Sequence, residues 1–318
     1  MARFLYSHAY YKKNKGRYEF IRLLGPDEYH ENVDNNAFTN YQAYYSLEKA
    51  LTVSDRLKVE NLELWGGLKN RLSLSESELI DWQDMLEKLY LPQPLPESGI
   101  IEQFDGYFEL EDVTPKTLEQ RLIKKNEYWG WPNGVAVHTQ VLKQADVLQL
   151  LVLQDLFPRD VVRANYDYYE TKTQHGSSLS PSVHAIIAVK AGYLEQAYSY
   201  FTRSSVIDLF NTNKAESGGT FIGGIHTASC GAAWQIIVFG FAGMKVNEDG
   251  LSFKPMLPEK WEKVKFKINY NKQKLILKLE KSGFKVDSDR ENTVSVTVQG
   301  YDQVKTIEPG DSARFDSN

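Results

Sequence analysis

The spacing of apolar residues changes once along this chain of 318 residues, near residue 243. Before that point apolar side chains recur at helical intervals, in stretches separated by loops rich in Gly, Pro, Ser and Asn. After it they alternate with polar ones, as in VKFKINY at 264–270. The first spacing is typical of helices and the second of strands with one buried face. The sequence therefore predicts a mainly α part over 1–242, followed by a small antiparallel β domain over 243–318.

Several stretches of the first part carry helix signals. Ser75 with Glu78 three residues later predicts a capping box at the start of one helix. The run VLQLLVL at 147–153 is apolar nearly all round, which indicates burial between other helices. Such helix pairs with loops between them suit a toroid of helical hairpins. Helices are expected over about 36–51, 55–70, 75 to the proline run at 92, 138–154, 158–170, 180–191, 193–210 and 226–241.

Charge and cysteine content limit the partners of the chain. Lys and Arg number 37 against 42 Asp and Glu, so the net charge of −5 provides no field that attracts nucleic acid or anionic membranes. The lone Cys230 excludes an intrachain disulfide and a thiolate-rich metal site, and it fits the cytoplasm. No leader peptide or membrane anchor is expected. Since dinucleotide, P-loop, zinc and calcium motifs are absent from the sequence, we expect no cofactor and no metal.

The densest polar stretch is GPDEYHENVDNNAFTN at 25–40, directly before an apolar helix. Asn35 and Asn36 are explained by helix capping, which needs one or two such residues. The whole block contains more polar residues than a helix cap requires. A carboxylic acid packed among Tyr and Pro can have its pKa raised by desolvation, which suits a general acid near neutrality. Glu28 is the better candidate than Asp27, because its longer side chain reaches into a cleft.

Two further blocks combine glycine with small hydroxyl groups or histidine. Ser177 and Ser178 follow a glycine just before a helix, a pattern that suits an oxyanion such as phosphate. Ser180 is explained as a helix cap, with Pro181 opening the helix. In SGGTFIGGIHTASCG at 217–231, His226 follows two glycine pairs that favour close approach to the backbone. A structural role for this histidine stays open.

Two other candidate sugar-binding features can each be interpreted in two ways. Lys143 and Gln144, placed within the helix expected at 138–154, would hold sugar hydroxyls if they face the interior and would be ordinary surface otherwise. The aromatic run Tyr128-Trp129-Gly130-Trp131 suits either a stacking platform for a sugar or the core.

Five blocks in order carry a resemblance: GPDEYHENVDNNAFTN, QFDGYF, LKQADVL, YDYYETKTQHGSSLSPS and GGIHTASCGAAWQIIVFGFAGM. On these blocks the chain resembles the C-terminal part of the disaccharide phosphorylases of glycoside hydrolase family 65, which include maltose, trehalose, kojibiose and nigerose phosphorylases. The resemblance implies a partial (α/α)6 barrel followed by a small antiparallel β domain. It also implies inverting phosphorolysis of an α-linked glucose disaccharide, giving β-glucose 1-phosphate and a free sugar.

The resemblance also assigns residues. Glu28 is similar to the general acid, Lys143 and Gln144 correspond to residues that hold the glucosyl unit, and the phosphate-binding positions correspond to Ser177, Ser178 and His226. The substrates implied are a disaccharide and inorganic phosphate. The resemblance suggests a homodimer. Because members of the family are more than twice this length, an N-terminal half is the other protein partner expected.

Two other functions stay open. A hydrolase of the same fold would use water and a base carboxylate, for which Glu216 is the nearest candidate. A non-catalytic carbohydrate-binding remnant would bind glycans without turnover.

Overall fold

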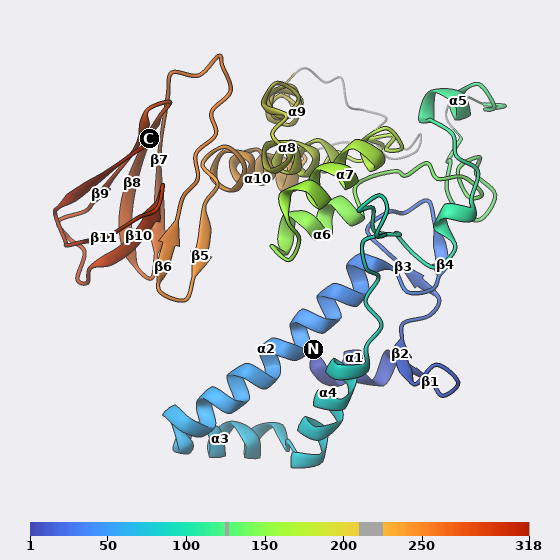
Figure 1. Ribbon diagram of the computed structural model, residues 1–318, viewed down its shortest axis with the longest axis horizontal. Coiled ribbons are helices and arrows are strands. Elements are labelled where there is room, and N and C mark those ends of the chain that lie inside the picture. The colour runs from blue at the N-terminus through green and yellow to red at the C-terminus, as the bar shows by residue number, and fades with distance from the viewer. Residues whose placement is uncertain (125–126, 210–224, 318) are drawn as a thin grey trace. The chain divides into compact units, whose positions relative to one another are not determined.

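The computed structural model describes residues 1–124, 127–209 and 225–317 (Figure 1). Within these residues the chain divides into two compact units, one being Met1–Gly176 and the other beginning at Ser177. Each unit has a hydrophobic core of its own.

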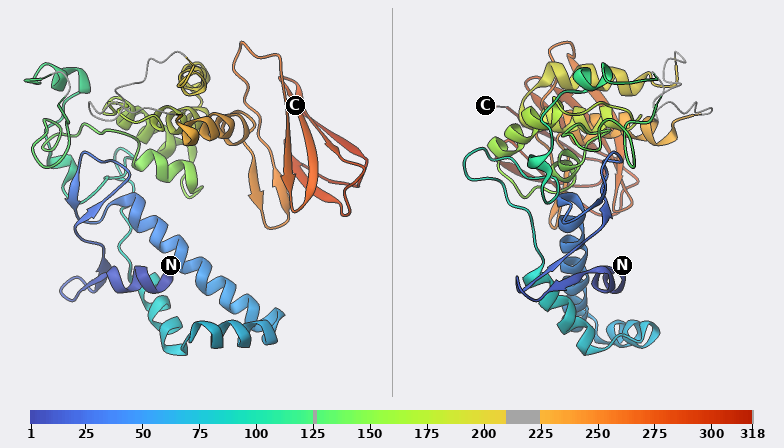
Figure 2. Two further views of the ribbon diagram at one scale, coloured as in Figure 1. Left: turned by 180° about the vertical axis from the view of Figure 1, so that it is seen from behind. Right: turned by 90° about the vertical axis from the view of Figure 1, so that its right-hand side faces the viewer.

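Helices are the main elements of the first unit, and α2 (Ala37–Glu60) is the longest of them (Figures 1 and 2). This first long helix extends past the end expected at residue 51 and includes the start of the helix expected at 55–70, so the next helix begins only at Leu62. Asn36 caps α2 by accepting the N–H of Thr39 at 2.9 Å. The capping box of Ser75 and Glu78 is confirmed at the start of α4. The helices of this unit are α1 (Ala2–His8), α2 (Ala37–Glu60), α3 (Leu62–Leu72), α4 (Glu76–Lys88), α5 (Pro115–Glu119), α6 (Val147–Leu153), α7 (Arg159–Glu170) and the 3-10 turn η1 (Tyr107–Glu109).

Four short strands that the sequence did not predict lie near the start of this unit. They form two antiparallel pairs, β1 (Tyr10–Lys12) with β2 (Arg17–Glu19) and β3 (Leu23–Leu24) with β4 (Glu31–Val33). Strands of two or three residues are too short to show an alternating pattern. The pairing of β3 with β4 holds both ends of the loop that carries Glu28.

The second unit begins with helices near the predicted positions. These are α8 (Ser180–Ala191), α9 (Leu194–Ser205) and α10 (Thr227–Gln235), which continues into the π-helix η2 (Ile236–Phe241). The change of period at about residue 243 is confirmed, since strands follow directly. They are β5 (Lys245–Asn247), β6 (Gly250–Ser252), β7 (Lys263–Tyr270), β8 (Gln273–Glu280), β9 (Gly283–Ser288), β10 (Val296–Gly300), β11 (Gln303–Ile307) and β12 (Ser312–Asp316).

The strands form two four-stranded sheets, in the orders β11-β10-β6-β5 and β12-β9-β8-β7. All the strand pairs are antiparallel as predicted, except that β6 and β10 run parallel. The β7–β8 hairpin turns on Asn271 and Lys272, whose φ angles of 47° and 66° are positive. Positive φ at both central residues is the signature of the type I′ turn, whose twist matches paired strands.

The core of the second unit joins its last helix to its strands. Val238 of η2 and the adjoining Ala242 belong to the same buried cluster as Leu277 of β8 and Phe284 of β9. The ring of Phe284 stacks on that of Phe315 with centroids 4.5 Å apart. The helix that follows His226 is therefore anchored by the β-strands.

Candidate functional site

Glu28 lies in the loop between β3 and β4. The Tyr128 hydroxyl donates to the Glu28 carbonyl at 2.8 Å and holds the loop from outside. The Glu28 side chain is 46% exposed. The sequence-based expectation that Glu28 is desolvated among Tyr and Pro is therefore wrong, and its carboxyl group is accessible to a substrate from solvent.

Both oxygens of the Glu28 carboxyl group accept hydrogen bonds from the predicted sugar-binding pair. The Nζ of Lys143 donates to Oε2 at 2.8 Å, and the Nε2 of Gln144 donates to Oε1 at 3.0 Å. Gln144 Nε2 also donates to the carbonyl of Pro26 at 2.6 Å. Three residues that the sequence singled out in two separate blocks thus meet at one carboxyl group.

Lys143 and Gln144 do not lie in a helix. The helix expected at 138–154 is wrong in its first half, since α6 begins only at Val147. Leu142 instead pairs with Thr173 as an isolated parallel bridge, and the Lys143 carbonyl accepts the N–H of Gly176. These tertiary contacts override the helical pattern. Lys143 is 5% exposed, so its side chain faces the interior and is not ordinary surface.

The aromatic run after residue 127 contains both core and surface residues. The ring of Trp129 is buried and stacks on Tyr29, with centroids 6.3 Å apart. Tyr128 and Trp131 are 37% and 39% exposed. The ring centroid of Tyr128 lies 5.8 Å from the Nζ of Lys143. Tyr128 therefore borders the carboxyl group of Glu28, while Trp129 belongs to the core.

A buried polar network lies beneath this loop. The Asp27 N–H donates to Asp146 Oδ2 at 3.2 Å, and Asn36 Nδ2 donates to both oxygens of Asp146 at 3.0 and 3.1 Å. His30 contacts Asp27 through Nδ1 at 2.6 Å. Burial and the negative charge of Asp27 together raise the pKa of Asp146 to about 7.

The raised pKa of Asp146 predicts a pH-dependent stability. An aspartate in the unfolded chain titrates near pH 3.9, so between about pH 4 and pH 7 the folded protein holds a proton that the unfolded chain has released. The contribution of Asp146 to the free energy of unfolding should fall by up to about 1.4 kcal/mol per pH unit as the pH rises through this window. Urea unfolding at pH 4.5 and 6.5 measures the fall.

The variant Asp146→Asn should make this fall smaller, because asparagine does not titrate, and the raised pKa of His30 should leave a smaller fall near the upper end of the window. The matched control is Asp55→Asn, a strongly exposed carboxyl group on α2 that should leave the fall unchanged. An equal pH dependence in the wild type and in Asp146→Asn would contradict the assignment.

The predicted phosphate-binding residues belong to the second unit. Ser177 and Ser178 form the turn before α8, where the N–H of Leu179 donates to Ser177 Oγ at 3.4 Å. The Ser229 hydroxyl, in the first turn of α10, donates to the Ser178 carbonyl at 3.0 Å. The expected cap at Ser180 is wrong by one residue, since Leu179 holds the cap position and Ser180 is already helical. The serine turn is thus tied to the helix that follows His226.

His226 precedes α10 and is paired with a carboxylate that the sequence did not reveal. Its Nδ1 lies 2.6 Å from Asp208 Oδ1, and its N–H donates to Asp208 Oδ2 at 2.8 Å. The hydrogen bond from the imidazole holds the pKa of Asp208 below its usual range. Because an ionised carboxylate accepts, Nδ1 carries a proton, and the opposite ring nitrogen is the one available to a ligand. That atom, Nε2, is buried and has no hydrogen-bond partner among the described residues.

The predicted site residues therefore fall into two groups. Glu28, Lys143 and Gln144 are in direct contact within the first unit, and the serines and His226 lie within the second. Asp208 was not predicted as a site residue, because a single aspartate in a stretch with a helical pattern carries no local signal. The alternative base Glu216 lies outside the described residues.

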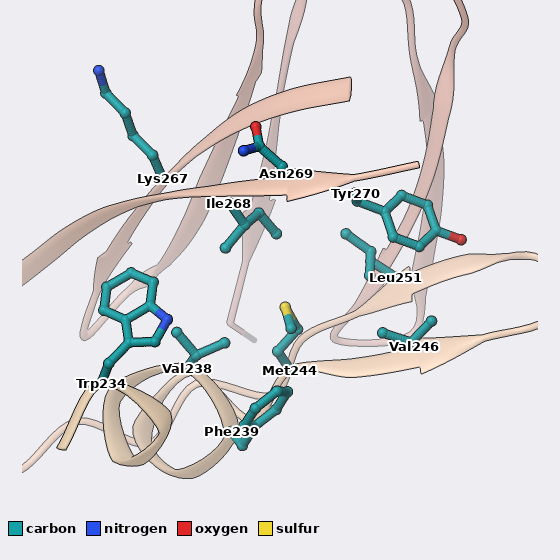
Figure 3. Close-up of a pocket in the computed structure, with 10 residues that line it drawn as sticks. All are labelled: Trp234, Val238, Phe239, Met244, Val246, Leu251, Lys267, Ile268, Asn269 and Tyr270. Atoms are coloured by element: carbon teal, nitrogen blue, oxygen red, sulfur yellow. The ribbon is translucent and has the colours of Figure 1, made fainter. Parts of the chain in front are cut away.

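A cavity of about 320 Å³ lies in the second unit between η2 and the strands (Figure 3). Its lining is mostly apolar and contains none of the predicted site residues. The residues that line it are Trp234, Val238, Phe239, Met244, Val246, Leu251, Lys267, Ile268, Asn269 and Tyr270. Two strongly polar side chains, those of Lys267 and Asn269, are among those that line it.

Two classes of feature are absent from the ranges that the structure describes. No helix there is both long and apolar enough to cross a membrane. In the same parts of the chain, no group of three or more His, Cys, Asp or Glu is placed to hold a metal ion.

Relatives of the chain are phosphorylases. It is 47% identical over 310 residues to the 1,2-alpha-glucosylglycerol phosphorylase of Bacillus selenitireducens, covering 97% of this chain and 40% of the relative. It is 39% identical to the kojibiose phosphorylase of Caldanaerobacter subterraneus, covering 94% of this chain and 38% of the relative. The chain thus spans about 40% of the length of these relatives.

A solved structure and two family models lead to the same family as these relatives. A solved structure from the human microbiome, assigned as a kojibiose phosphorylase, matches with a TM-score of 0.82 and 28% identity over 99% of this chain and 42% of that one. The fold is mainly α, part of an (α/α)6 barrel followed by a small β domain. The glycosyl hydrolase family 65 central catalytic domain matches residues 1–235, and the C-terminal domain of that family matches residues 244–307. The chain therefore belongs to glycoside hydrolase family 65.

Proposed function

We propose that this chain carries the acid and the phosphate-binding residues of an inverting disaccharide phosphorylase. The substrates are an α-linked glucose disaccharide and inorganic phosphate, and the products are β-glucose 1-phosphate and a free sugar. The observation that carries the proposal is the convergence of Lys143 and Gln144 on the carboxyl group of Glu28. The phosphorylase relatives support the reaction class.

Glu28 is the general acid in this proposal. Its carboxyl group gives a proton to the glycosidic oxygen as the bond from that oxygen to the anomeric carbon breaks. Lys143 and Gln144, which donate to Glu28, also have the donor groups that glucosyl hydroxyls need. The carboxylate left by proton transfer accepts from these same two donors, which stabilises its charge.

Phosphate is the nucleophile in this proposal. An inverting hydrolase needs a second carboxylate to activate water, whereas a phosphate anion can attack the anomeric carbon directly from the opposite face. The protein then has to bind an anion, and Ser177, Ser178 and His226 are the groups proposed to do so. Asp208 fixes the ring of His226 and leaves Nε2 for a phosphate oxygen.

The test is a phosphate-dependent assay against a panel of α-linked glucose disaccharides and glucosylglycerol. Because the chain spans about 40% of its relatives, it is assayed alone and as a fusion behind the N-terminal part of the Bacillus selenitireducens relative. Nuclear magnetic resonance of the product should show β-glucose 1-phosphate, formed only when phosphate is present.

Two outcomes would replace the proposal. Release of free glucose without phosphate would indicate a hydrolase, with Glu216 as the candidate base. Glycan binding with no turnover in either form, and unchanged in Glu28→Gln, would indicate a carbohydrate-binding remnant.

The remaining assignments belong to the same proposal. Residues 1–242 form the C-terminal half of the catalytic barrel, and residues 243–318 form the C-terminal β domain. The reaction needs no cofactor beyond phosphate as co-substrate and takes place in the cytoplasm. The protein partner is a second copy of the chain or an N-terminal half, rather than nucleic acid or a membrane.

A further inference from the structure

Asp27, next to Glu28 in the loop, holds the two segments of the acid cluster together. Its Oδ1 accepts the backbone N–H of Lys143 at 2.8 Å and that of Tyr29 at 3.2 Å. This one oxygen atom therefore binds the backbone of Tyr29, directly after Glu28. It also binds the backbone of Lys143, in the segment that supplies the hydrogen-bond donors to Glu28. The side chain is almost completely buried, so water does not compete for these hydrogen bonds.

We propose that Asp27 is a positioning residue that sets the carboxyl group of Glu28 against Lys143 and Gln144. This inference rests on the proposed function, in which Glu28 is the acid. Asp27 touches neither sugar nor phosphate in this scheme. It acts through the backbone, because a shift of about 1 Å in an acid or its partners is enough to slow a reaction by about 100-fold.

The other oxygen of Asp27 faces His30, and the contacts of His30 indicate its charge. Its Nε2 lies 2.8 Å from the carbonyl of Thr139, which can only accept, so Nε2 carries a proton. Its Nδ1 lies 2.6 Å from Asp27 Oδ2, so with Asp27 ionised both ring nitrogens donate. Burial opposes the charged imidazole, but the charge and hydrogen bond of Asp27 outweigh it and raise the pKa of His30. When His30 is protonated, its contact with Asp27 is a buried ion pair.

The same loop is fixed from below by Asp146, through the N–H of Asp27. Gly25 allows this close approach, because a Cβ there would lie 2.5 Å from both Asn36 Nδ2 and Asp146 Oδ2. Asp146 therefore holds the backbone of Asp27, while the carboxylate of Asp27 holds the backbone N–H of Lys143. This arrangement is a rigid support rather than a surface turn.

Two substitutions separate the position of the Asp27 carboxyl group from its charge. Asp27→Asn keeps the shape: its Oδ1 can still accept from Lys143 and Tyr29, and its amide can donate to a neutral His30. Asp27→Glu keeps the charge but moves the oxygens outward by one methylene. If Asp27 acts by position, Asp27→Asn should retain kcat for the disaccharide within about tenfold, and Asp27→Glu should lose about 100-fold.

The loss in Asp27→Glu should have the signature of a displaced acid. The KM for phosphate should stay within about twofold of the wild type. Turnover of α-glucosyl fluoride, whose leaving group needs no protonation, should fall far less than turnover of the disaccharide. A merely structural loss would lower both rates together. If Asp27→Glu does not fold, Asp27→Ala takes its place, since it also removes the acceptor.

A spectroscopic readout tests the ion pair without any turnover. The titratable groups facing the imidazole of His30 are Asp27, Asp146 and Tyr107. The imidazole resonances of His30 should titrate at a higher pH in the wild type than in Asp27→Asn, because the carboxylate of Asp27 raises the pKa of the ring.

The outcomes distinguish this inference from the proposed function. A wild type that forms no β-glucose 1-phosphate, with the His30 signature intact, would overturn the function and leave Asp27 as a structural anchor only. An active wild type in which Asp27→Asn loses as much as Asp27→Glu would overturn the positioning role in favour of charge. Undiminished disaccharide turnover in Asp27→Glu would overturn it outright.

Discussion

Replacing Glu28 by Gln should lower kcat for the disaccharide by about 10²–10⁴-fold, the range that a general acid contributes. The carboxamide has nearly the same shape but no proton to give to the departing sugar oxygen. Turnover of α-glucosyl fluoride should stay within a few fold of the wild type, since fluoride leaves without protonation. Initial rates with both substrates, in whichever form of the protein is active, measure the difference.

The matched control for this variant is Glu31→Gln, three residues along in β4. It removes a negative charge from the same hairpin without touching Lys143 or Gln144, so disaccharide turnover should be retained. An equal loss on both substrates in Glu28→Gln would mean that Glu28 holds the sugar or the fold, and the acid would have to be sought elsewhere.

Replacing His226 by Ala should raise the KM for phosphate at least tenfold and change the KM for the disaccharide much less. A hydrogen bond to a charged group is worth about 1.5–3 kcal/mol, which corresponds to roughly 10- to 100-fold in affinity. Asp208→Asn should shift the phosphate KM in the same direction by a smaller factor, because it loosens the ring without removing it. Phosphate titrations at saturating disaccharide measure both effects.

His138→Ala is the control for the histidine, because the His138 side chain is exposed and outside the proposed site. An unchanged phosphate dependence in His226→Ala would remove this residue from the anion site. The serines would then have to bind phosphate without it.

The second half of the fold was the more predictable one. Alternating valine, leucine and phenylalanine residues mark β7 and β8 correctly, and the two-residue turn between them follows from their pairing. The parallel pairing of β6 with β10 was not predictable, because it joins residues far apart in sequence. In the first half, the apolar run at 147–153 is a helix as predicted, with Val147, Leu148, Leu150 and Leu151 buried and Leu153 exposed. The residues just before this run are not helical, because they are held by contacts with distant segments of the chain.

The candidate site shows the same limit. Glu28 was found because its block holds more polar residues than a helix cap requires. The contact of Glu28 with Lys143 joins residues 115 positions apart, and no local pattern could reveal it. Asp27 was passed over because its side chain is shorter, although being short and buried is what suits it to bind backbone N–H groups.

The shared core of η2 and the β-strands has a consequence for how this protein can change over time. The helix that starts after His226 ends among the buried side chains of β8 and β9. A residue such as Leu277 contacts no substrate in the proposed mechanism, yet it supports the helix whose first turn is tied to the serine loop. Under the proposed function, substitutions in the interior of the strands should therefore also change phosphate affinity, so catalysis would constrain the sequence of the C-terminal domain.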